Sequence, residues 1–206
     1  MWGEWDHLQP DRYLKSGASF RLRRLGCFEL TPATGGLRLL SHAAYYQPRD
    51  VNPYAGGIHR RFAALRDSTA TNRFLHELIR FDFSQFPVEG WEAVNTWTID
   101  VHLFRIIGNP DEAGEPTPEG VHHDGDEFNA VHLVQRENAV GGVSGVYDND
   151  QRPLERLTLR EPMDSLFIWD PHVMHGVSPI RPKVPGKPAI RDVLIIGYNP
   201  DRSAAI

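Results

Sequence analysis

The chain has little cysteine, no long apolar run and no excess of positive charge. Cys27 is the only cysteine, which excludes an internal disulfide and a cysteine-rich zinc site and predicts a reducing, cytoplasmic setting. Lys and Arg number 22 against 27 Asp and Glu, and the net charge of -5 disfavours a nucleic-acid partner. Aliphatic runs such as VLII (193–196) are too short to span a bilayer, and the first residues do not resemble a secretory signal.

Length and composition indicate one globular domain. The 206 residues are 40% hydrophobic and 24% charged, enough for one sizeable core but cramped for two. We expect a single domain over 1–206, with supporting strands and helices in 1–95 and a β-rich core in 96–200. The ten histidines are more than this length normally carries, and they are the one compositional hint of metal chemistry.

The first third of the chain combines strand and helix signals. Strands are predicted over 20–30 and 35–47, with the turn-forming TPATGG between them. Apolar residues then recur at helical spacing in RRFAAL (60–65) and NRFLHELIRFDF (72–83), and Asn72 is placed to cap the second helix.

The rest of the chain reads as strands separated by turns. TWTIDVHLFRII (96–107) alternates apolar and polar residues, which predicts a strand with two distinct faces. Further strands are predicted over 127–135, 142–148, 154–159, 164–170 and 191–199. No helical pattern separates these later strands, which disfavours a βαβ fold. The prediction is a mainly β fold with N-terminal helices, a sandwich or jelly roll.

The stretch PEGVHHDGDEF crowds metal-competent side chains between glycines. At a strand end, residues two apart point to one face, so His122 and Asp124 converge while His123 points away. One imidazole and one carboxylate can hold two adjacent corners of a metal ion. Taken alone, the triplet is equally compatible with an acidic, solvated turn. Asp126 replaces Asp124 only if Gly125 allows a bulge.

A later segment, WDPHVMHGVSPI, supplies further candidates in His172 and His175. It follows far enough after Asp124 for several antiparallel strands to bring the chain back. Two histidines and one carboxylate form a ligand face that leaves positions open, a set that suits non-haem Fe(II) activating O₂. Arg191 opens the next strand signal, and its guanidinium matches the carboxylate of an acid cosubstrate that chelates the metal.

Several motifs in order carry a family resemblance: PEGVHHDG, HLVQREN, GGVSGVYD, HGVSPI and RDVLIIGYN. Over about residues 96 to 200 the chain resembles the bacterial Fe(II)/2-oxoglutarate dioxygenases that hydroxylate free amino acids, the isoleucine 4-hydroxylase relatives. The resemblance implies a double-stranded β-helix (jelly-roll, cupin-like) core with Fe(II), 2-oxoglutarate and O₂. It also implies His122, Asp124 and His175 as iron ligands.

The same resemblance implies that Arg191 grips the distal carboxylate of 2-oxoglutarate, with Arg181 as the alternative anchor. His172 is then an exposed loop histidine rather than the ligand. His132 falls in phase with Asp124 along the strand pattern, so it is a candidate for cofactor binding or a hydrogen-bonded core histidine.

Substrate-binding candidates come from the neighbouring strands. Arg105 is a candidate for the carboxylate of an amino acid, and equally for a surface arginine, with Asp100 or Asp148 as the ammonium partner. His102 shares a strand face with Asp100, and Tyr147 follows a Gly-Gly pair.

The function implied is hydroxylation of an unactivated carbon of a free L-amino acid or amino-acid-like small molecule, with release of succinate and CO₂. A cupin-like isomerase or cosubstrate-independent dioxygenase is the first rival, since it shares the jelly roll. The second is a non-catalytic jelly-roll binding protein with incidental histidines. Neither a nucleic acid nor a membrane is an expected partner, and the sequence does not specify the oligomeric state.

Overall fold

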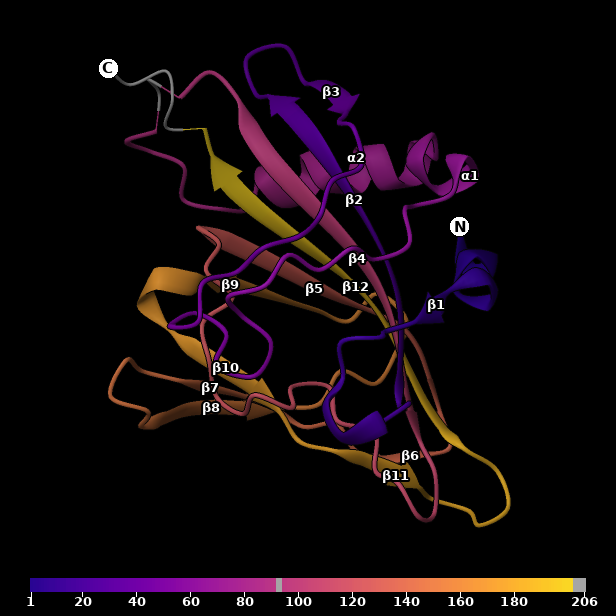
Figure 1. Ribbon diagram of the computed structural model, residues 1–206. Coiled ribbons are helices and arrows are strands. Elements are labelled where there is room, and N and C mark those ends of the chain that lie inside the picture. Colours follow the sequence, from indigo (N-terminus) through magenta and orange to yellow (C-terminus); the bar gives the residue numbers. More distant parts are fainter. Residues whose placement is uncertain (92–93, 202–206) are drawn as a thin grey trace.

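The computed structural model describes residues 1–91 and 94–201, and this part is built mainly from β-strands (Figure 1). The strands are β1 (Gln9–Pro10), β2 (Arg21–Thr31), β3 (Gly36–Leu39), β4 (Trp97–Gly108), β5 (Phe128–Glu137), β6 (Ala139–Gly141), β7 (Ser144–Tyr147), β8 (Pro153–Leu157), β9 (Ser165–Trp169), β10 (Met174–Val177), β11 (Ile180–Pro182) and β12 (Ala189–Pro200). The helices are α1 (Asp67–Ala70) and α2 (Arg73–Phe83), with 3-10 turns η1 (Trp2–His7), η2 (Lys15–Gly17) and η3 (Asp170–His172).

The strands pair antiparallel in one large and two small sheets. The large sheet runs β1-β2-β4-β12-β5-β9, with β3 paired to β2, and the small sheets are β10-β7-β8 and β11-β6. β4 and β12 form its centre and pair along their whole length, from Trp97 opposite Pro200 to Gly108 opposite Ala189. The mainly β architecture that the sequence predicts is therefore confirmed.

The central strand β4 has two faces because its side chains alternate. Trp97, Ile99, Val101 and Leu103 are buried on one face, in the main hydrophobic core. Leu194, Ile196 and Tyr198 of β12 join the same core from the neighbouring strand. His102 and Phe104 point to the opposite face, so the sheet separates an apolar core from a more polar interior.

Helix α2 covers the apolar face of the large sheet. The side chain of Asn72 caps the helix by accepting a hydrogen bond from the backbone N–H of Phe74 at 3.0 Å, as the sequence predicts. Leu75, Leu78 and Ile79 pack into the main core with the β4 side chains. No helix among residues 1–91 and 94–201 combines the length and the apolar character that crossing a membrane requires.

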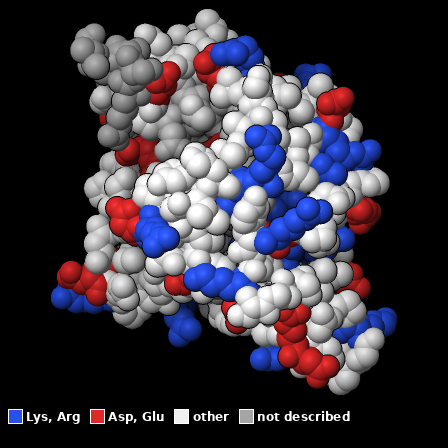
Figure 2. Space-filling view, in the orientation of Figure 1, with Lys and Arg blue, Asp and Glu red and all other residues white. Residues whose placement is uncertain are grey.

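A small sheet covers the other face, which makes a two-layer fold. Leu157 at the end of β8 and Leu159, two residues beyond it, pack against Leu133 and Val193 of the large sheet in a separate apolar cluster. Figure 1 shows the strands β7, β8 and β10 as a layer beside the large sheet. On the outer surface, the face in Figure 2 has acidic and basic side chains interspersed.

Two predictions for the first third need correction. Residues 60–65 are extended rather than helical. Arg60 forms an isolated β-bridge with Tyr45, and Ala64 forms one with Leu25 of β2. The apolar side chains Phe62 and Leu65 are buried in this extended segment, so their helical spacing was coincidental. In 35–47 only β3 is a strand, apart from that bridge at Tyr45.

Candidate metal centre and active-site pocket

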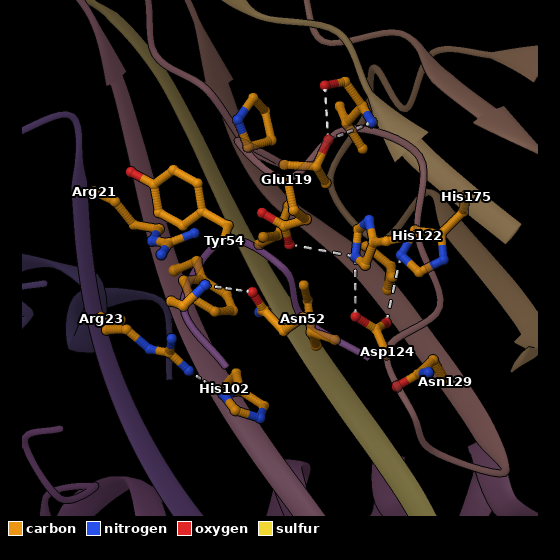
Figure 3. Close-up of a pocket in the computed structure, with 18 of the residues that line it drawn as sticks. Arg21, Arg23, Asn52, Tyr54, His102, Glu119, His122, Asp124, Asn129 and His175 are labelled. Carbon is orange, nitrogen blue, oxygen red and sulfur yellow. Dashed lines mark hydrogen bonds and ion pairs between the residues drawn. The ribbon is translucent and has the colours of Figure 1, made fainter. Parts of the chain in front are cut away.

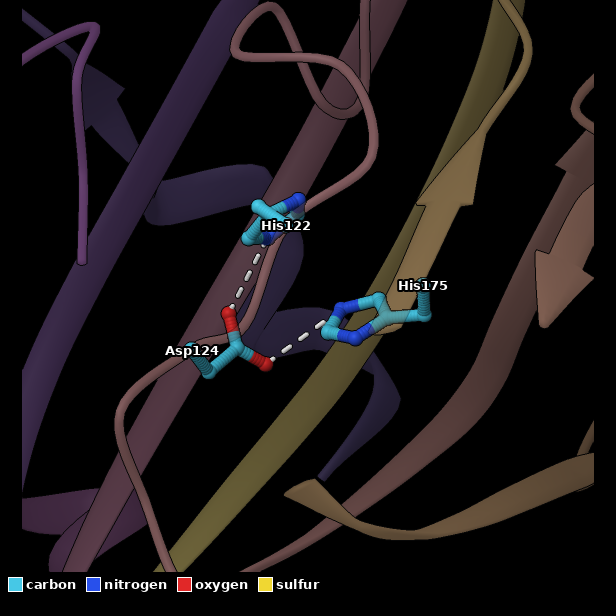
Figure 4. Close-up of side chains that lie close together, drawn as sticks. All are labelled: His122, Asp124 and His175. Carbon is cyan, nitrogen blue, oxygen red and sulfur yellow. Dashed lines mark hydrogen bonds and ion pairs between the residues drawn. The ribbon is translucent and has the colours of Figure 1, made fainter. Parts of the chain in front are cut away.

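Three side chains from two distant segments converge in the polar interior. One potential ligand atom from each of His122, Asp124 and His175 lies within 4.8 Å of the others (Figure 4). Nε2 of His122 is 3.3 Å from Oδ1 of Asp124, and Nε2 of His175 is 3.4 Å from Oδ2. Both histidines are less than a tenth exposed. The structure thus brings together the three residues that the sequence singles out as metal ligands.

Backbone pairing holds the two histidines side by side. The N–H of His122 donates to the carbonyl of His175 and the N–H of His175 to the carbonyl of His122, both at 2.9 Å. Strand β10, which carries His175, is held in turn by its pairing with β7. Asp124, two residues after His122, reaches the same side of the chain, as an extended backbone requires.

Asp170 supports the segment that carries Asp124. Its carboxylate accepts hydrogen bonds from the backbone N–H groups of Asp124 at 3.0 Å and Gly125 at 2.9 Å. Gly125 has φ of +87°, a conformation that favours glycine and turns the chain after the candidate ligand. His123 points away from the metal centre, with Nδ1 2.7 Å from the carbonyl of Asp170, as the sequence predicts.

The electrostatics favour an ionised carboxylate between the two imidazoles. Burial alone would raise the pKa of Asp124, but His175 and His122 hold it well below its usual value. Burial lowers the pKa of His175 to about 4, so this ring is neutral at pH 7. Against the opposing effect of burial, Asp124 and Glu119 raise the pKa of His122 to about 9. A divalent cation would replace the proton on His122.

The donor set fits non-haem iron. Nδ1 of His122 lies 2.9 Å from the carbonyl of Gly120, so its N–H donates there and Nε2 faces Asp124. Two imidazoles and one carboxylate form a ligand face with open positions, the arrangement that suits Fe(II) in oxygenases. His172 lies elsewhere, with its ring 4.0 Å from that of Trp169, and Asp126 accepts a hydrogen bond from Asn199.

The three side chains line a pocket that extends between the sheets (Figure 3). Its floor comes from the polar-interior face of β4, β5 and β12, and a loop over residues 45–60 covers one side. Besides the three candidate ligands, its lining includes Arg21, Arg23, Tyr45, Asn52, Tyr54, Arg60, His102, Phe104, Glu119, Asn129, Val131, Val177, Arg191, Val193 and Ile195.

Arg191 places an unsatisfied positive charge in this pocket. It is 2% exposed, and its Nε and one terminal nitrogen have no hydrogen-bond partner in the described part of the chain. Burial and the nearby Arg136 lower its pKa to about 10, which leaves it charged at pH 7. Arg181, the alternative anchor, is exposed on β11. A buried guanidinium without a partner indicates a binding site for an anion.

Nearly the whole chain matches one protein family. The 2OG-Fe dioxygenase family matches residues 3–197, almost the whole chain. The chain belongs to the 2OG-Fe dioxygenase family. Membership implies Fe(II), 2-oxoglutarate and O₂, the cofactors that the resemblance predicts, and the cluster of two histidines and one aspartate fits the iron.

Two curated relatives of this dioxygenase match 75% of the chain. One is a 3(1)-hydroxy-L-isoleucine 4-dioxygenase from Pantoea ananatis, 25% identical over 158 residues. The other is an L-isoleucine-4-hydroxylase from Bacillus thuringiensis, 24% identical over 157 residues. The matches span 63% and 65% of the relatives' own lengths, so the chain corresponds to a little under two-thirds of each.

Solved structures confirm the jelly-roll fold of the dioxygenase. A bsmA homologue from Methylobium petroleophilum superposes with a TM-score of 0.84 at 34% identity, over 96% of this chain and 78% of that one. IDO from Bacillus thuringiensis gives 0.76 at 18% identity, over 97% and 81%. The Fe(II)/α-ketoglutarate-dependent dioxygenase TqaL gives 0.73 at 22% identity, over 97% and 73%.

Of the predicted substrate residues, the structure brings His102 into the pocket of the dioxygenase. Its Nδ1 lies 2.6 Å from a terminal nitrogen of Arg23, and burial, followed by Arg23, holds its pKa well below the usual value. Asp100 shares this face of β4 but accepts a hydrogen bond from Cys27 Sγ at 2.7 Å and does not line the pocket. Burial and Asp100 raise the pKa of the Cys27 thiol.

The structure does not bring Arg105 or Tyr147 into the pocket. Arg105 lies on the opposite face of β4, where it makes a two-point ion pair with Asp192 at 2.8 and 2.7 Å. An odd position on β4 cannot share a face with His102, because strand side chains alternate. Tyr147 is at the end of β7, outside the pocket lining, and Asp148 next to it forms a turn by accepting from the N–H groups of Asp150 and Arg152.

His132 also lies outside the pocket, on the helix-covered face of β5. Its Nε2 is 2.8 Å from the Asp82 carboxylate on α2, and its Nδ1 is 2.7 Å from the Ser165 hydroxyl. The expected phase with Asp124 fails because the positive φ of Gly125 interrupts the extended backbone between them. The pair is fully buried, which fits the alternative prediction of a hydrogen-bonded core histidine.

We expect His132→Ala to lower the free energy of unfolding by about 3 kcal/mol, because it leaves the buried Asp82 carboxylate without its main partner. Urea unfolding followed by circular dichroism measures the change. His7→Ala, at an exposed position, is the matched control and should change stability by less than about 0.5 kcal/mol. Unchanged stability with a raised KM for 2-oxoglutarate would instead support a cofactor-binding role.

Several polar residues of the pocket are not among those that the sequence predicts. Arg21 and Arg23 on β2 and Arg60 on the covering loop line it, as does Asn129, whose amide is buried without a hydrogen-bond partner among the described residues. The signal for the first two was present in FRLRRLGCFEL, since arginines two apart on a strand share one face. Nothing local to the sequence indicated that this face is the pocket.

Proposed function

We propose that the protein is an Fe(II)/2-oxoglutarate-dependent enzyme that hydroxylates an unactivated carbon of a free L-amino acid or amino-acid-like small molecule. The observation that carries this is the convergence of His122, Asp124 and His175 in a pocket that also contains the unpaired guanidinium of Arg191. Two curated relatives, one named for the hydroxylation of L-isoleucine and one for the dioxygenation of a hydroxy-L-isoleucine, support the substrate class.

Each group has a defined role in this proposal. His122, Asp124 and His175 would hold the iron, and Arg191 would bind the distal carboxylate of 2-oxoglutarate through its free N–H groups. When bound, iron and 2-oxoglutarate supply the oxidising chemistry that converts C–H and O₂ to C–OH, with 2-oxoglutarate becoming succinate and CO₂.

The chain itself positions the reactants and excludes water. Asp170 fixes the backbone at Asp124 and Gly125 through two hydrogen bonds, which orients the candidate ligand. The apolar side chains of Val131, Val193 and Ile195 line the pocket, so a bound substrate would be shielded from solvent there.

The test is succinate formation with Fe(II), 2-oxoglutarate, O₂ and a panel of the L-amino acids. We expect at least one amino acid to raise succinate formation at least tenfold over the substrate-free rate and to gain one oxygen atom by mass spectrometry. Reactions without Fe(II) or without 2-oxoglutarate are the controls. Succinate formation that no member of the panel stimulates would contradict the proposed substrate class.

The cupin-like rival predicts turnover that does not depend on 2-oxoglutarate, so the same controls distinguish it. A jelly-roll binding protein predicts no stoichiometric iron.

We also propose that residues 1–206 form one domain, because the main core joins Trp5 and Phe28 of the N-terminal part to Phe128 and Tyr198. A cytoplasmic location is part of the same proposal and rests on the single cysteine.

A further inference from the structure

A second group of buried arginines lines the pocket away from Arg191. Arg21 and Arg23 project from β2, and Arg60 reaches in from the loop that covers the pocket. Figure 3 shows Arg21 and Arg23 on one side of the pocket and the candidate iron ligands on the other, with Asn52 and Tyr54 between. Both sides line one continuous pocket.

The arginines in this group carry more positive charge than the protein neutralises. In the described part of the chain, Asp11 is the only carboxylate within ion-pair distance of Arg21, Arg23 or Arg60. Oδ2 of Asp11 is 2.8 Å from Nε of Arg21 but 3.8 Å from a terminal nitrogen of Arg23. Three guanidiniums and one close carboxylate leave an excess of positive charge, which is costly to bury unless an anion joins it.

The guanidinium of Arg23 is fixed in position and has an N–H group free to bind such an anion. It is 4% exposed, and its guanidinium lies between the rings of Phe62 and Phe104, 3.6 and 4.4 Å from their centroids. Its Nε has no hydrogen-bond partner among the described residues. One terminal nitrogen donates to Nδ1 of His102, which fixes the position of the guanidinium plane.

Arg60 is the second arginine with free hydrogen-bonding capacity. It is 3% exposed, and its Nε also lacks a partner within the described residues. One terminal nitrogen donates to the side-chain oxygen of Gln47, so the guanidinium is anchored at one edge. Arg23 and Arg60 are close enough for Arg60 to lower the pKa of Arg23, a smaller effect than those of burial and Arg21.

This group is distinct from the Arg191 site. Arg191 lies on β12, with the whole of β4 between it and β2. The charge that perturbs the pKa of Arg191, after burial, is that of Arg136 and not that of the β2 arginines. The pocket therefore offers two separate places for an anion, as required by a reaction with two acidic reactants.

We propose that Arg23 and Arg60 bind the free carboxylate of the oxidised substrate, with His102 positioning Arg23. This inference rests on the proposed function and narrows it. The substrate is a small molecule with an unblocked carboxylate, such as a free amino acid, and not an amino acid joined to a carrier or peptide through that carboxyl group.

The test compares acids with their amides. The protein is loaded anaerobically with Fe(II) and 2-oxoglutarate and titrated by calorimetry with L-isoleucine, the other L-amino acids and the corresponding primary amides. We expect the tightest-binding acid to bind about ten- to a hundredfold more tightly than its amide, the range for loss of a charge-assisted hydrogen bond. Equal binding of acid and amide, or no binding of any acid, overturns the proposal.

Variants assign the effect to residues. Arg23→Gln and Arg60→Gln should each lower the affinity for the acid by about ten- to a hundredfold and the affinity for the amide by less than threefold. The affinity for 2-oxoglutarate should be unchanged. Arg23→Lys should recover only part of the loss, because an ammonium lacks the guanidinium fork. Arg61→Gln removes the same charge at the adjacent exposed position and should leave both affinities unchanged.

The outcomes separate this inference from the proposed function. If Arg23→Gln lowers the affinities for acid and amide equally, or lowers the affinity for 2-oxoglutarate instead, the carboxylate assignment is overturned. The proposed function is not affected by that result. Preferential acid binding with no succinate formed overturns the proposed function alone. If one variant does not fold by circular dichroism, the variant of the other arginine tests the assignment, and the acid and amide comparison on the unaltered chain decides whether a free carboxylate is recognised.

Discussion

Replacing His175 by alanine is expected to abolish stoichiometric iron binding and to reduce amino-acid-dependent succinate formation at least about a thousandfold. His175 supplies one of the three donor atoms that converge within 4.8 Å, and its ring is buried and neutral. Mutations beside a metal ligand typically cost ten- to a hundredfold in affinity or activity, and loss of the ligand itself costs more. Iron content after anaerobic reconstitution and the succinate rate measure the two effects.

His172→Ala is the matched control, because it removes a nearby imidazole that packs on Trp169 outside the cluster. We expect this variant to retain iron and activity within about twofold. If His172→Ala lost the iron while His175→Ala kept it, the assignment of the third ligand would be wrong. Circular dichroism of both variants establishes that the fold is retained.

Replacing Arg191 by methionine is expected to raise the KM for 2-oxoglutarate at least about thirtyfold. A two-point contact between guanidinium and carboxylate in a buried site costs about 2–5 kcal/mol to remove, and each 1.4 kcal/mol is tenfold. Methionine keeps an unbranched side chain of moderate length, so the main change is the lost charge. The KM is measured from succinate formation at saturating amino acid.

Although Arg191→Met should weaken 2-oxoglutarate binding, we do not expect it to destabilise the ligand-free protein. In the ligand-free protein Arg191 is a buried charge without a carboxylate partner among the described residues, so Arg191→Met should not lower the melting temperature. Arg181→Met, at the exposed alternative on β11, should leave the KM within about twofold. A large effect on the KM from Arg181 and none from Arg191 would exchange the two assignments.

The amino-acid sequence by itself determined several local elements, though not the extended segment over 60–65, and it determined the candidate ligands. The alternation in 96–107 specifies a two-faced strand, and Asn72 specifies where α2 begins, because both depend on neighbouring residues only. The spacing of His122 and Asp124 similarly ensures that both reach the same side of an extended chain. The order of short motifs indicated the family to which the chain belongs.

Only the tertiary structure decided which other side chains reach the pocket. Arg23 and Arg105 both lie on strands of the large sheet, yet one enters the pocket and the other pairs with Asp192 on the opposite face. His132 does not share the face of Asp124, because the positive φ of Gly125 interrupts the extended backbone between them. It pairs instead with Asp82 of α2, a residue distant in sequence. Which face of a strand lies toward a pocket depends on what packs against it, and those partners come from distant segments.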